Sequence, residues 1–591
     1  MRIKDIFIIV LCGVLGAAFL IGAAMQLDDI RSAREEMGLV ATAALENAPP
    51  SLAFATVALG AFRGLLVNIL WIRADNLKQE GKFFDAKQLA EWITTLQPRF
   101  AAVWDFHAWN MAYNISVAIP NTQPEERWRW VRNGYELLRD RAIPLNPNSI
   151  LLYRSLAWIF QHKIGDIADD CHRYYKKELA LSMRAVLGER PDSALFEKLA
   201  ATPQTLEGIL ADPKVREFVE ALRQVDSAFE NRNRLVDNYL SLRQNPARFS
   251  EAALAVIEQW HGSEAMQAFD YFARAAKLRN EWKFDIDFMV EMNTEFGPVD
   301  INDPNQTYPL NWEHPAAHAL YWGAMGLKVA GRPDQYRIDE KNTDRIVFHS
   351  LQMLYRRGRV VLYDDENWGT AVYLLPDMRM FDVCDRFWQE IIQKYEEFEG
   401  GNPKAVRGGH KNFLENAVLM FYQSGHTRKA ERIYRQLKTQ HEYDDQGFVR
   451  TEYQVPMMTF VRNRLKEELE SISIHDATEF IVSVLREGYF RYALYEDDEA
   501  AGRENLAREV YELYQREMGQ YEQERVGLPS LDRLRYGAFM SFLEDPMYPE
   551  QMRQNLLSRI QIERPDLFER LRRQNERVIE ELRSQQQEQQ N

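Results

Sequence analysis

Apolar residues recur along the chain at the spacing of paired amphipathic helices. Between Leu70 and Pro98 they follow a helical period, and Gly81 interrupts them where a turn between two helices is expected. Trp104 comes 34 residues after Leu70 and opens a second helix of the same kind. The pattern therefore predicts a chain that is helical nearly throughout and is built from repeated helix pairs.

A third unit begins further along. Tyr153 follows Pro147 by six residues, as Trp104 follows Pro98. The stretch "ISVAIPNTQPEERWRWV" separates the first helix of the second unit from its companion, and we interpret it as an insertion. Three units in register favour a repeat over a single catalytic motif.

The same pattern returns in the second half of the chain. The stretch 322–329 repeats the first-helix pattern, and Ala507 and Tyr511 have the spacing of a second helix. "RVVLY" and "TAVYLL", separated by "DDENWG", predict a small β-hairpin because both are β-rich and bounded by turn residues. A further helix pair is expected at the positions Leu414, Phe421, Gly425, Ala430 and Tyr434.

These spacings match a known repeat signature. Tetratricopeptide repeats are 34-residue helix pairs with W, G, Y, A and P slots. The residues in those slots here are Leu70, Ala74, Leu77, Ala86 and Pro98. The chain resembles the tetratricopeptide (TPR) superfamily over about 66 to 180 and 411 to 440. "WITTLQPRFAAVWDFHAWNMAYNIS" and "HPAAHALYWGAMGL" also resemble bacterial membrane-anchored repeat proteins of uncharacterised activity. The resemblance implies an all-α, TPR-like solenoid of helical hairpins with irregular insertions.

The N-terminus holds a long apolar run. Ile6 to Met25 spans twenty uncharged residues, which match the length of a transmembrane helix. A cleavable signal peptide is the alternative, but its apolar part would be shorter. Because Arg2 and Lys4 precede the run, we expect the N-terminus in the cytoplasm and the bulk outside the cytoplasmic membrane, held by a single span.

A second apolar segment leaves another topology open. Ser51 to Ile72 is long enough to span a membrane, although Arg63 near its middle would be costly there. If this segment crosses, the chain forms a two-helix membrane hairpin and its bulk lies in the cytoplasm.

The patterning predicts seven regions. They are a membrane anchor (1–27), a connecting helix (28–65), N-terminal repeats (66–190), an irregular helical region with a linker (191–310), a repeat helix with the β-hairpin (311–400), C-terminal repeats (401–580) and a disordered tail (581–591).

Charge and cysteine content exclude some classes of protein. The net charge is −15, with 88 acidic and 73 basic residues, so nucleic acid is not an expected partner. The cysteines at 12, 171 and 384 form no C-x-x-C pair and have no zinc-site spacing, which leaves a disulfide framework and a structural metal unsupported. Their spacing does not fix whether Cys171 and Cys384 pair.

Two groups of residues have metal-binding chemistry but a simpler explanation. His314 and His318 are spaced i, i+4, but the Glu of a metalloprotease motif is missing. "HKIGDIADDCH" could also supply ligands, although Asp and His are common at helix ends. That stretch contains His162, Asp166, Asp169, Asp170 and His172. With no hydrolase or nucleotide-binding motif present, we expect no catalytic residue, no metal and no cofactor.

The functional hypothesis is a membrane-anchored interaction scaffold of the bacterial cell envelope. First helices of successive repeats line a shared surface, so positions outside the packing signature should face a protein or peptide partner. The candidates share one face of two such helices: Asp105, Trp109, Tyr113, Arg154, Trp158 and His162. Packing of these aromatics by the insertion or by second helices is the competing interpretation. The alternative function is a membrane-attached enzyme acting on an envelope polymer.

Overall fold

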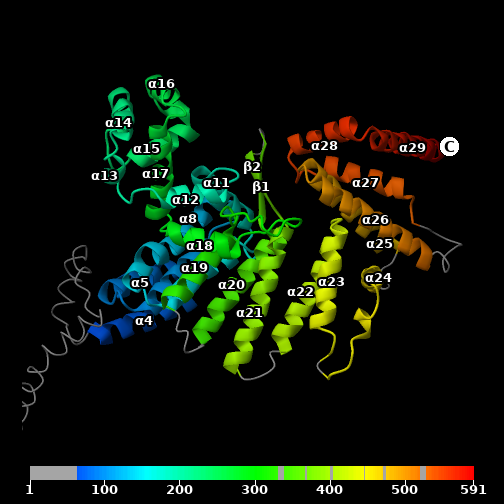
Figure 1. The fold of residues 1–591 in the computed structure, drawn as a ribbon, viewed down its shortest axis with the longest axis horizontal. Helices are drawn as coiled ribbons and strands as arrows, with labels where there is room; N and C mark the ends of the chain where they lie inside the picture. Colours follow the sequence, from blue (N-terminus) through cyan, green and yellow to red (C-terminus); the bar gives the residue numbers. More distant parts are fainter. Residues whose placement is uncertain are drawn as a thin grey trace, which may run out of the picture. The chain divides into compact units, whose positions relative to one another are not determined.

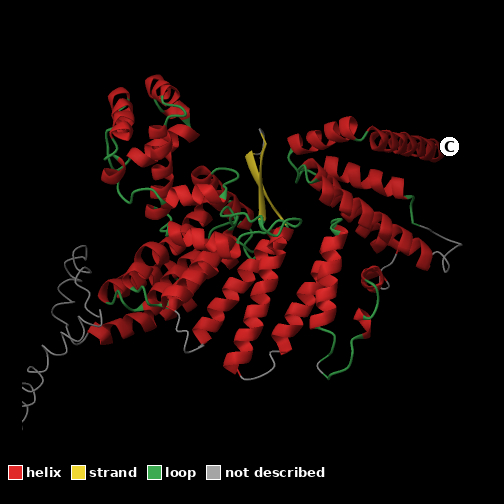
Figure 2. Ribbon diagram, viewed as in Figure 1, coloured by secondary structure: helices red, strands yellow, loops and turns green. Residues whose placement is uncertain are grey.

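The protein is described by a computed structural model that covers residues 63–330, 338–365, 369–399, 404–444, 446–469, 474–518 and 528–590. The described chain is mostly helical with one small two-stranded sheet, which confirms the all-α expectation (Figures 1 and 2). It divides into two compact units. The first holds 63–175 and 318–347, and the second holds 176–317 and 348–590.

The first unit is a series of helix pairs. Its elements are α4 (Arg63–Gln79), α5 (Phe83–Leu96), α6 (Ala101–Trp109), η2 (Asn110–Ile115), α7 (Ser116–Ala118), α8 (Pro124–Leu137), η3 (Leu138–Ala142), α9 (Ile143–Leu145), α10 (Ile150–Trp158), η4 (Ile159–Ile164), most of α19 (Pro315–Ala330) and the start of α20 (Ile338–Arg357). The segments η2, η3 and η4 are π-helical.

Local sequence explains the first of these pairs. Gly81 has a φ of 75°, which suits a residue without Cβ, and Lys82 N–H donates to the carbonyl of Leu77 at 2.8 Å. This bond closes α4 and lets α5 return along it. Ala86 and Ala90, both fully buried, allow the helices to approach closely.

A loop carbonyl fixes the next pair against the first. Trp104 is 1% exposed, and its indole Nε1 donates to the carbonyl of Pro98 at 2.8 Å. The Asn146 amide donates to the same carbonyl at 3.0 Å, from the far end of the second pair. The segment expected to be an insertion is not separate, because 115–118 completes the first helix of this pair and 124–131 begins the second.

Helix α19 packs directly on α10, although about 160 residues separate them in sequence. A Cβ atom at Gly326 would lie 2.6 Å from the Cβ of Tyr153, so only glycine permits this contact. The amide of Gln161 donates to the carbonyl of Ile346 at 2.8 Å. The stretch 322–329 is therefore helical, as its pattern predicts, and it continues the series after a long intervening region.

The second unit contains the remaining elements. They are most of α11 (His172–Leu187), α12 (Ser193–Ala200), α13 (Leu206–Ile209), α14 (Pro213–Val225), η5 (Ser227–Phe229), α15 (Leu235–Gln244), η6 (Pro246–Arg248), α16 (Glu251–Gln259), α17 (Glu264–Asn280), α18 (Ile286–Phe296), β1 (Arg359–Asp365), β2 (Gly369–Leu375), η7 (Met378–Met380), α21 (Phe381–Glu399), α22 (Lys404–Gln423), α23 (Thr427–Gln440), η8 (Thr451–Tyr453), α24 (Met457–Leu469), α25 (Ile474–Ala493), α26 (Asp497–Met518), α27 (Leu531–Glu544), α28 (Glu550–Glu563) and α29 (Pro565–Gln590).

The region 191–310, expected to be irregular, has a well-packed part of its own. Phe218, Tyr239 and Phe269 are fully buried in one cluster, with Phe218 and Phe269 ring centroids 6.0 Å apart. Side chains of Asp212 and Ser263 accept hydrogen bonds at the starts of α14 and α17. The helices of this region differ widely in length, from 4 residues in α13 to 17 in α17, which accounts for the lack of a clear repeat in its sequence.

The expected C-terminal helix pair and β-hairpin are both present. Gly425, with a φ of 82°, joins α22 to α23, and Phe421 and Ala430 are fully buried at the predicted spacing. Strands β1 and β2 pair antiparallel, with Arg359 opposite Leu375.

Two expectations concern the ends of the chain. The apolar run Ile6 to Met25 and residues 51–62 of the second segment lie outside the described residues, among which no helix is long and apolar enough to span a membrane. In the part of the predicted disordered tail (581–591) that the structure describes, α29 continues to Gln590. Gln and Glu are good helix formers, so a polar tail can prolong an existing helix.

Candidate binding surface

Two helices of the first unit have the same build at an offset of 49 residues. Helix α6 covers Ala101–Trp109 and is followed by the six-residue π-segment η2. Helix α10 covers Ile150–Trp158 and is followed by the six-residue π-segment η4. Each π-segment lies at the same place in its helix, and π-helical turns are frequent at functional sites.

The six sequence candidates fall on these two helices at matching positions. They form what we call the aromatic stripe: Asp105, Trp109 and Tyr113 on α6–η2, and Arg154, Trp158 and His162 on α10–η4. Trp109 is 40% exposed, and the other five side chains are half-buried.

The rings of the stripe form a continuous row. Trp109 stacks on Tyr113 with centroids 4.1 Å apart and planes 16° apart. Trp158 stacks on His162 at 4.8 Å and 9°. The Tyr113 hydroxyl lies 3.3 Å from His162 Nδ1, which joins the two stacks across the helices. The structure therefore brings these four predicted residues together.

The charged end of the stripe also bridges the two helices. Asp105 is hydrogen-bonded to the side chain of Ser155 on α10 and lies near Arg154. Arg154 Nη1 lies 2.5 Å from Asp339 Oδ1, a residue of α20. Burial raises the pKa of Asp105, and the Ser155 hydrogen bond and the Arg154 charge oppose that rise.

The row of rings is uncharged at neutral pH. Burial raises the pKa of the Tyr113 phenol and lowers the pKa of His162, so both groups favour their neutral forms. Lys163 Nζ lies 5.2 Å from the Tyr113 ring centroid. The row therefore consists of stacked, neutral rings and ends at one exposed tryptophan, Trp109.

The stretch "HKIGDIADDCH" does not gather as a metal site. Asp169, 4% exposed, accepts hydrogen bonds from Lys163 at 2.6 Å and from Arg127 at 3.1 Å. Its charge is thus compensated by two cations, while His162 faces Tyr113 and Asp170 is exposed. Within the described residues, no group of three or more His, Cys, Asp or Glu side chains could hold a metal ion.

The remaining candidates are buried structural residues. His314 is fully buried, and its Nδ1 accepts a hydrogen bond from Ala316 N–H at 3.0 Å. His318 is fully buried and stacks on Phe160 at 4.9 Å. Cys171 and Cys384 are both buried free thiols.

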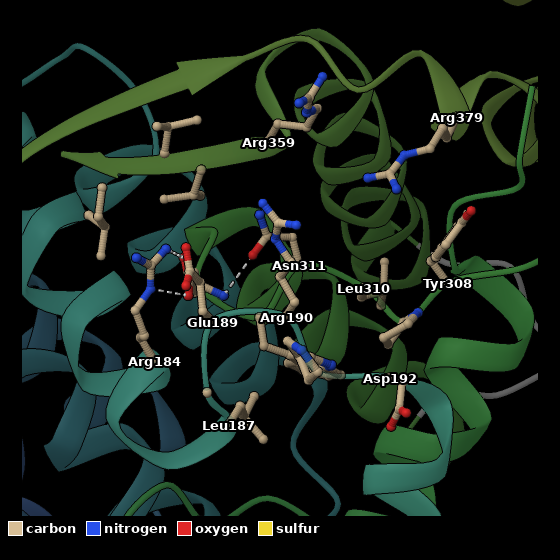
Figure 3. A pocket seen from close by; sticks show the side chains of 18 of the residues that line it. Arg184, Leu187, Glu189, Arg190, Asp192, Tyr308, Leu310, Asn311, Arg359 and Arg379 are labelled. Carbon is tan, nitrogen blue, oxygen red and sulfur yellow. Dashed lines mark hydrogen bonds and ion pairs between the residues drawn. The ribbon is translucent and has the colours of Figure 1, made fainter. Parts of the chain in front are cut away.

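Sequence reasoning missed a cleft of about 940 Å³ with several charged lining residues in the second unit (Figure 3). The turn after α11, the loop 306–313 and the first residues of β1 line it. Arg184 donates to both carboxylate oxygens of Glu313, at 2.7 and 2.8 Å. Burial raises the pKa of Glu313, and the hydrogen bonds from Arg184 oppose that rise.

Two further arginines of this cleft are neutralised in the same way. Arg379 donates twice to Asp377, each time at 2.8 Å, and Arg359 lies 2.6 Å from Glu496. These ion pairs leave the cleft with little net positive charge to attract an anion. Comparison of the sequence with models of protein families and with curated proteins found no match.

Proposed function

We propose that this protein is a membrane-anchored scaffold of a bacterial envelope that binds a protein or peptide partner through the aromatic stripe. The observation that supports it best is the exposure of Trp109 at the end of a row of four rings contributed by two equivalent helices. Aromatic and arginine side chains dominate the energetics of protein interfaces, and each is worth about 2 kcal/mol or more when it is a hot spot.

The helix pairs support the same proposal. Repeats of the tetratricopeptide type expose the faces of successive first helices to a ligand, and the two helices of the stripe are adjacent first helices of this kind. The ion pair with Asp339 of α20 restricts the Arg154 side chain before a partner binds. A preorganised surface loses less conformational entropy on binding.

The test is capture of a partner by the full chain from envelope membranes, quantified by mass spectrometry. Trp109→Ala with Trp158→Ala should abolish capture of a partner that the unaltered chain retains, while the circular dichroism spectrum is preserved. Trp92→Ala is the matched control, because Trp92 is also 40% exposed but lies on the second helix α5. Equal capture by the unaltered chain, the double variant and Trp92→Ala would show that the stripe is not the binding surface.

The membrane part of the proposal has a separate test. With one N-terminal span, a reporter that works only outside the cytoplasm should be active when it is fused after Asn591. If instead a reporter that works only in the cytoplasm is active at this position, the result supports the two-helix hairpin and overturns the single-span topology.

A further inference from the structure

A second surface, on α23 in the second unit, has a different chemistry from the stripe. The sequence "TRKAERIYRQLKTQ" buries Ala430, Ile433, Tyr434 and Leu437 on one side. Arg428, Arg432 and Arg435 are exposed on the other side, spaced i, i+4 and i+7, so they follow one face of the helix. We call these three residues the arginine face.

The arginine face borders a cleft of about 1020 Å³. Met457 and Met458 at the start of α24 and the loop residues Ile301 and Asn302 also line this cleft. Met458 is 45% exposed, so a flexible apolar side chain is available beside the guanidinium groups. The cleft therefore combines positive charge with an adaptable apolar wall.

The charges of this face are not compensated as they are in the cleft of Figure 3. There, Arg184, Arg359 and Arg379 each pair with a carboxylate. On α23, within the described residues, neither Arg428 nor Arg432 has an ion pair. The third member of the face, Arg435, has only a contact of 3.3 Å with Glu431, in which the arginine side chain is 74% exposed.

The overall charge of the chain makes the lack of an ion pair at Arg428 and Arg432, among the described residues, informative. Acidic residues outnumber basic ones by 88 to 73, so a carboxylate partner is easy to provide. A cationic face beside a cleft is complementary to a negatively charged ligand and would steer its approach.

We infer that the arginine face binds an acidic, extended stretch of polypeptide from a partner protein. Four residues of α-helix rise about 6 Å, which is close to the roughly 6.6 Å between alternate residues of an extended chain. Acidic side chains at alternate positions can thus reach Arg428 and Arg432 in turn. The intervening side chains then face Met458 and its neighbours.

The probe for this site is a fluorescein-labelled nine-residue peptide with Glu at alternate positions and Leu or Ala between them. The full chain, in mild detergent, should bind it, and binding should weaken steeply as salt is raised. The same peptide with Gln in place of Glu should bind at least tenfold more weakly. Binding of both peptides with equal affinity would overturn the inference.

Paired variants separate the site from general charge. Arg428→Gln with Arg432→Gln should weaken binding of the acidic peptide at least tenfold. Arg573→Gln with Arg577→Gln changes the net charge equally at two exposed i, i+4 positions of α29 and should leave affinity within twofold. An equal loss in both double variants would show that only net charge matters and that no site exists on α23.

Two further comparisons define the ligand. Met458→Ser should weaken the peptide a few-fold, because the apolar wall contributes contact. Inorganic phosphate at millimolar concentration should displace little peptide, and complete displacement would mean that the face binds a small anion instead of a polypeptide.

The stripe variant Trp109→Ala with Trp158→Ala should bind the acidic peptide normally, so failure of either proposal can be told from failure of the other.

Discussion

The helices α6–η2 and α10–η4 share their boundaries but differ in the side chains that make them stable. Val103 and Leu152 are fully buried at equivalent positions, and so are Ala108 and Ala157. The common frame therefore depends on a few apolar and small residues. Side chains elsewhere on the two helices have diverged, and their differences show what each helix adds to that frame.

The sharpest difference is at one core position. His107 and Leu156 are 49 residues apart and are 2% and 0% exposed. Within the part of the chain that the structure describes, neither imidazole nitrogen of His107 has a hydrogen-bond partner. Burial lowers the pKa of His107 to about 3, and nearby positive charges contribute to this shift. Leu156 shows that the same frame accepts an apolar side chain at this position.

The two helices also use different polar groups. In η2, the amide of Asn110 donates to the carbonyl of Phe83 at 2.9 Å, and Asn114 donates to Asn110 at 2.9 Å. In η4, Lys163 takes the place of Asn114 and pairs with buried Asp169. One pair is thus held by neutral amides and the other by buried charges, which are more costly to disrupt.

The largest effect is expected from Asp169→Ala. This change leaves Lys163 and Arg127 buried without a counter-charge, and such losses cost about 3 to 5 kcal/mol of stability. Urea unfolding followed by circular dichroism measures it, with Asp170→Ala as the exposed control. A loss below about 1 kcal/mol would show that water reaches the cluster. The buried ion pairs of α10–η4 would then stabilise that helix about as weakly as the amide hydrogen bonds stabilise α6–η2.

The same cluster predicts a response to acid. Burial alone would raise the pKa of Asp169. The hydrogen bond and charge of Lys163, the hydrogen bond from Cys171 N–H and the charge of Arg127 outweigh burial and hold the pKa below its ordinary value. The unfolded state therefore binds the proton more readily. The stabilisation is complete above the unfolded pKa of about 3.9 and is lost as the pH falls through the lower folded-state pKa.

A smaller effect of the opposite sign is expected from His107→Leu, which copies Leu156 into the first helix. The folded-state pKa of about 3 lies below the ordinary 6.5, so the unfolded state takes up a proton first as pH falls. Titration of His107 leaves the free energy of unfolding unchanged above pH 6.5 and lowers it by about 2 kcal/mol at pH 5.

Measurement at two pH values tests this prediction. His107→Leu should unfold at higher urea than the unaltered chain at pH 7.5, and its advantage should be larger at pH 5. His261→Gln, an exposed histidine, is the control and should change neither value. An unchanged or lower stability of His107→Leu at both pH values would mean that the residues packed around position 107 fit an imidazole better than a leucine side chain.

The sequence predicts helix pairs well where glycine marks the turn. Gly81 and Gly425 have positive φ angles, and both were expected between helices. The turn between α25 and α26 was not expected, because Tyr495, with a φ of 63°, occupies the corresponding place. Its bonding is the same, since Glu496 N–H donates to the carbonyl of Arg491 at 3.0 Å, as Lys82 donates to Leu77.

The candidate surface was predictable in part. Helical spacing placed Trp109 with Tyr113 and Trp158 with His162, and the structure stacks both pairs. The 49-residue offset could have been read from Pro98 and Pro147, but the 34-residue repeat signature suggested an insertion instead. Helical periodicity also cannot predict the contact of Arg154 with α20, because more than 140 residues lie between Arg154 and that helix in the sequence.

The smallest effect concerns the charged end of the stripe, where equivalent positions carry opposite charges. The folded Asp105 carboxyl holds its proton more tightly than the unfolded one, because burial raises its pKa. Its charge at pH 7 therefore opposes folding, and Asp105→Asn should raise stability by a few tenths of a kcal/mol, with the gain vanishing near pH 4. Arg154→Gln removes a partly exposed ion pair with Asp339 and should lower stability by about 0.5 kcal/mol. Urea unfolding at pH 7 and pH 4 distinguishes the two, and a loss of stability in both variants at pH 7 would show that Asp105 and Arg154 stabilise each other more than burial penalises the carboxylate.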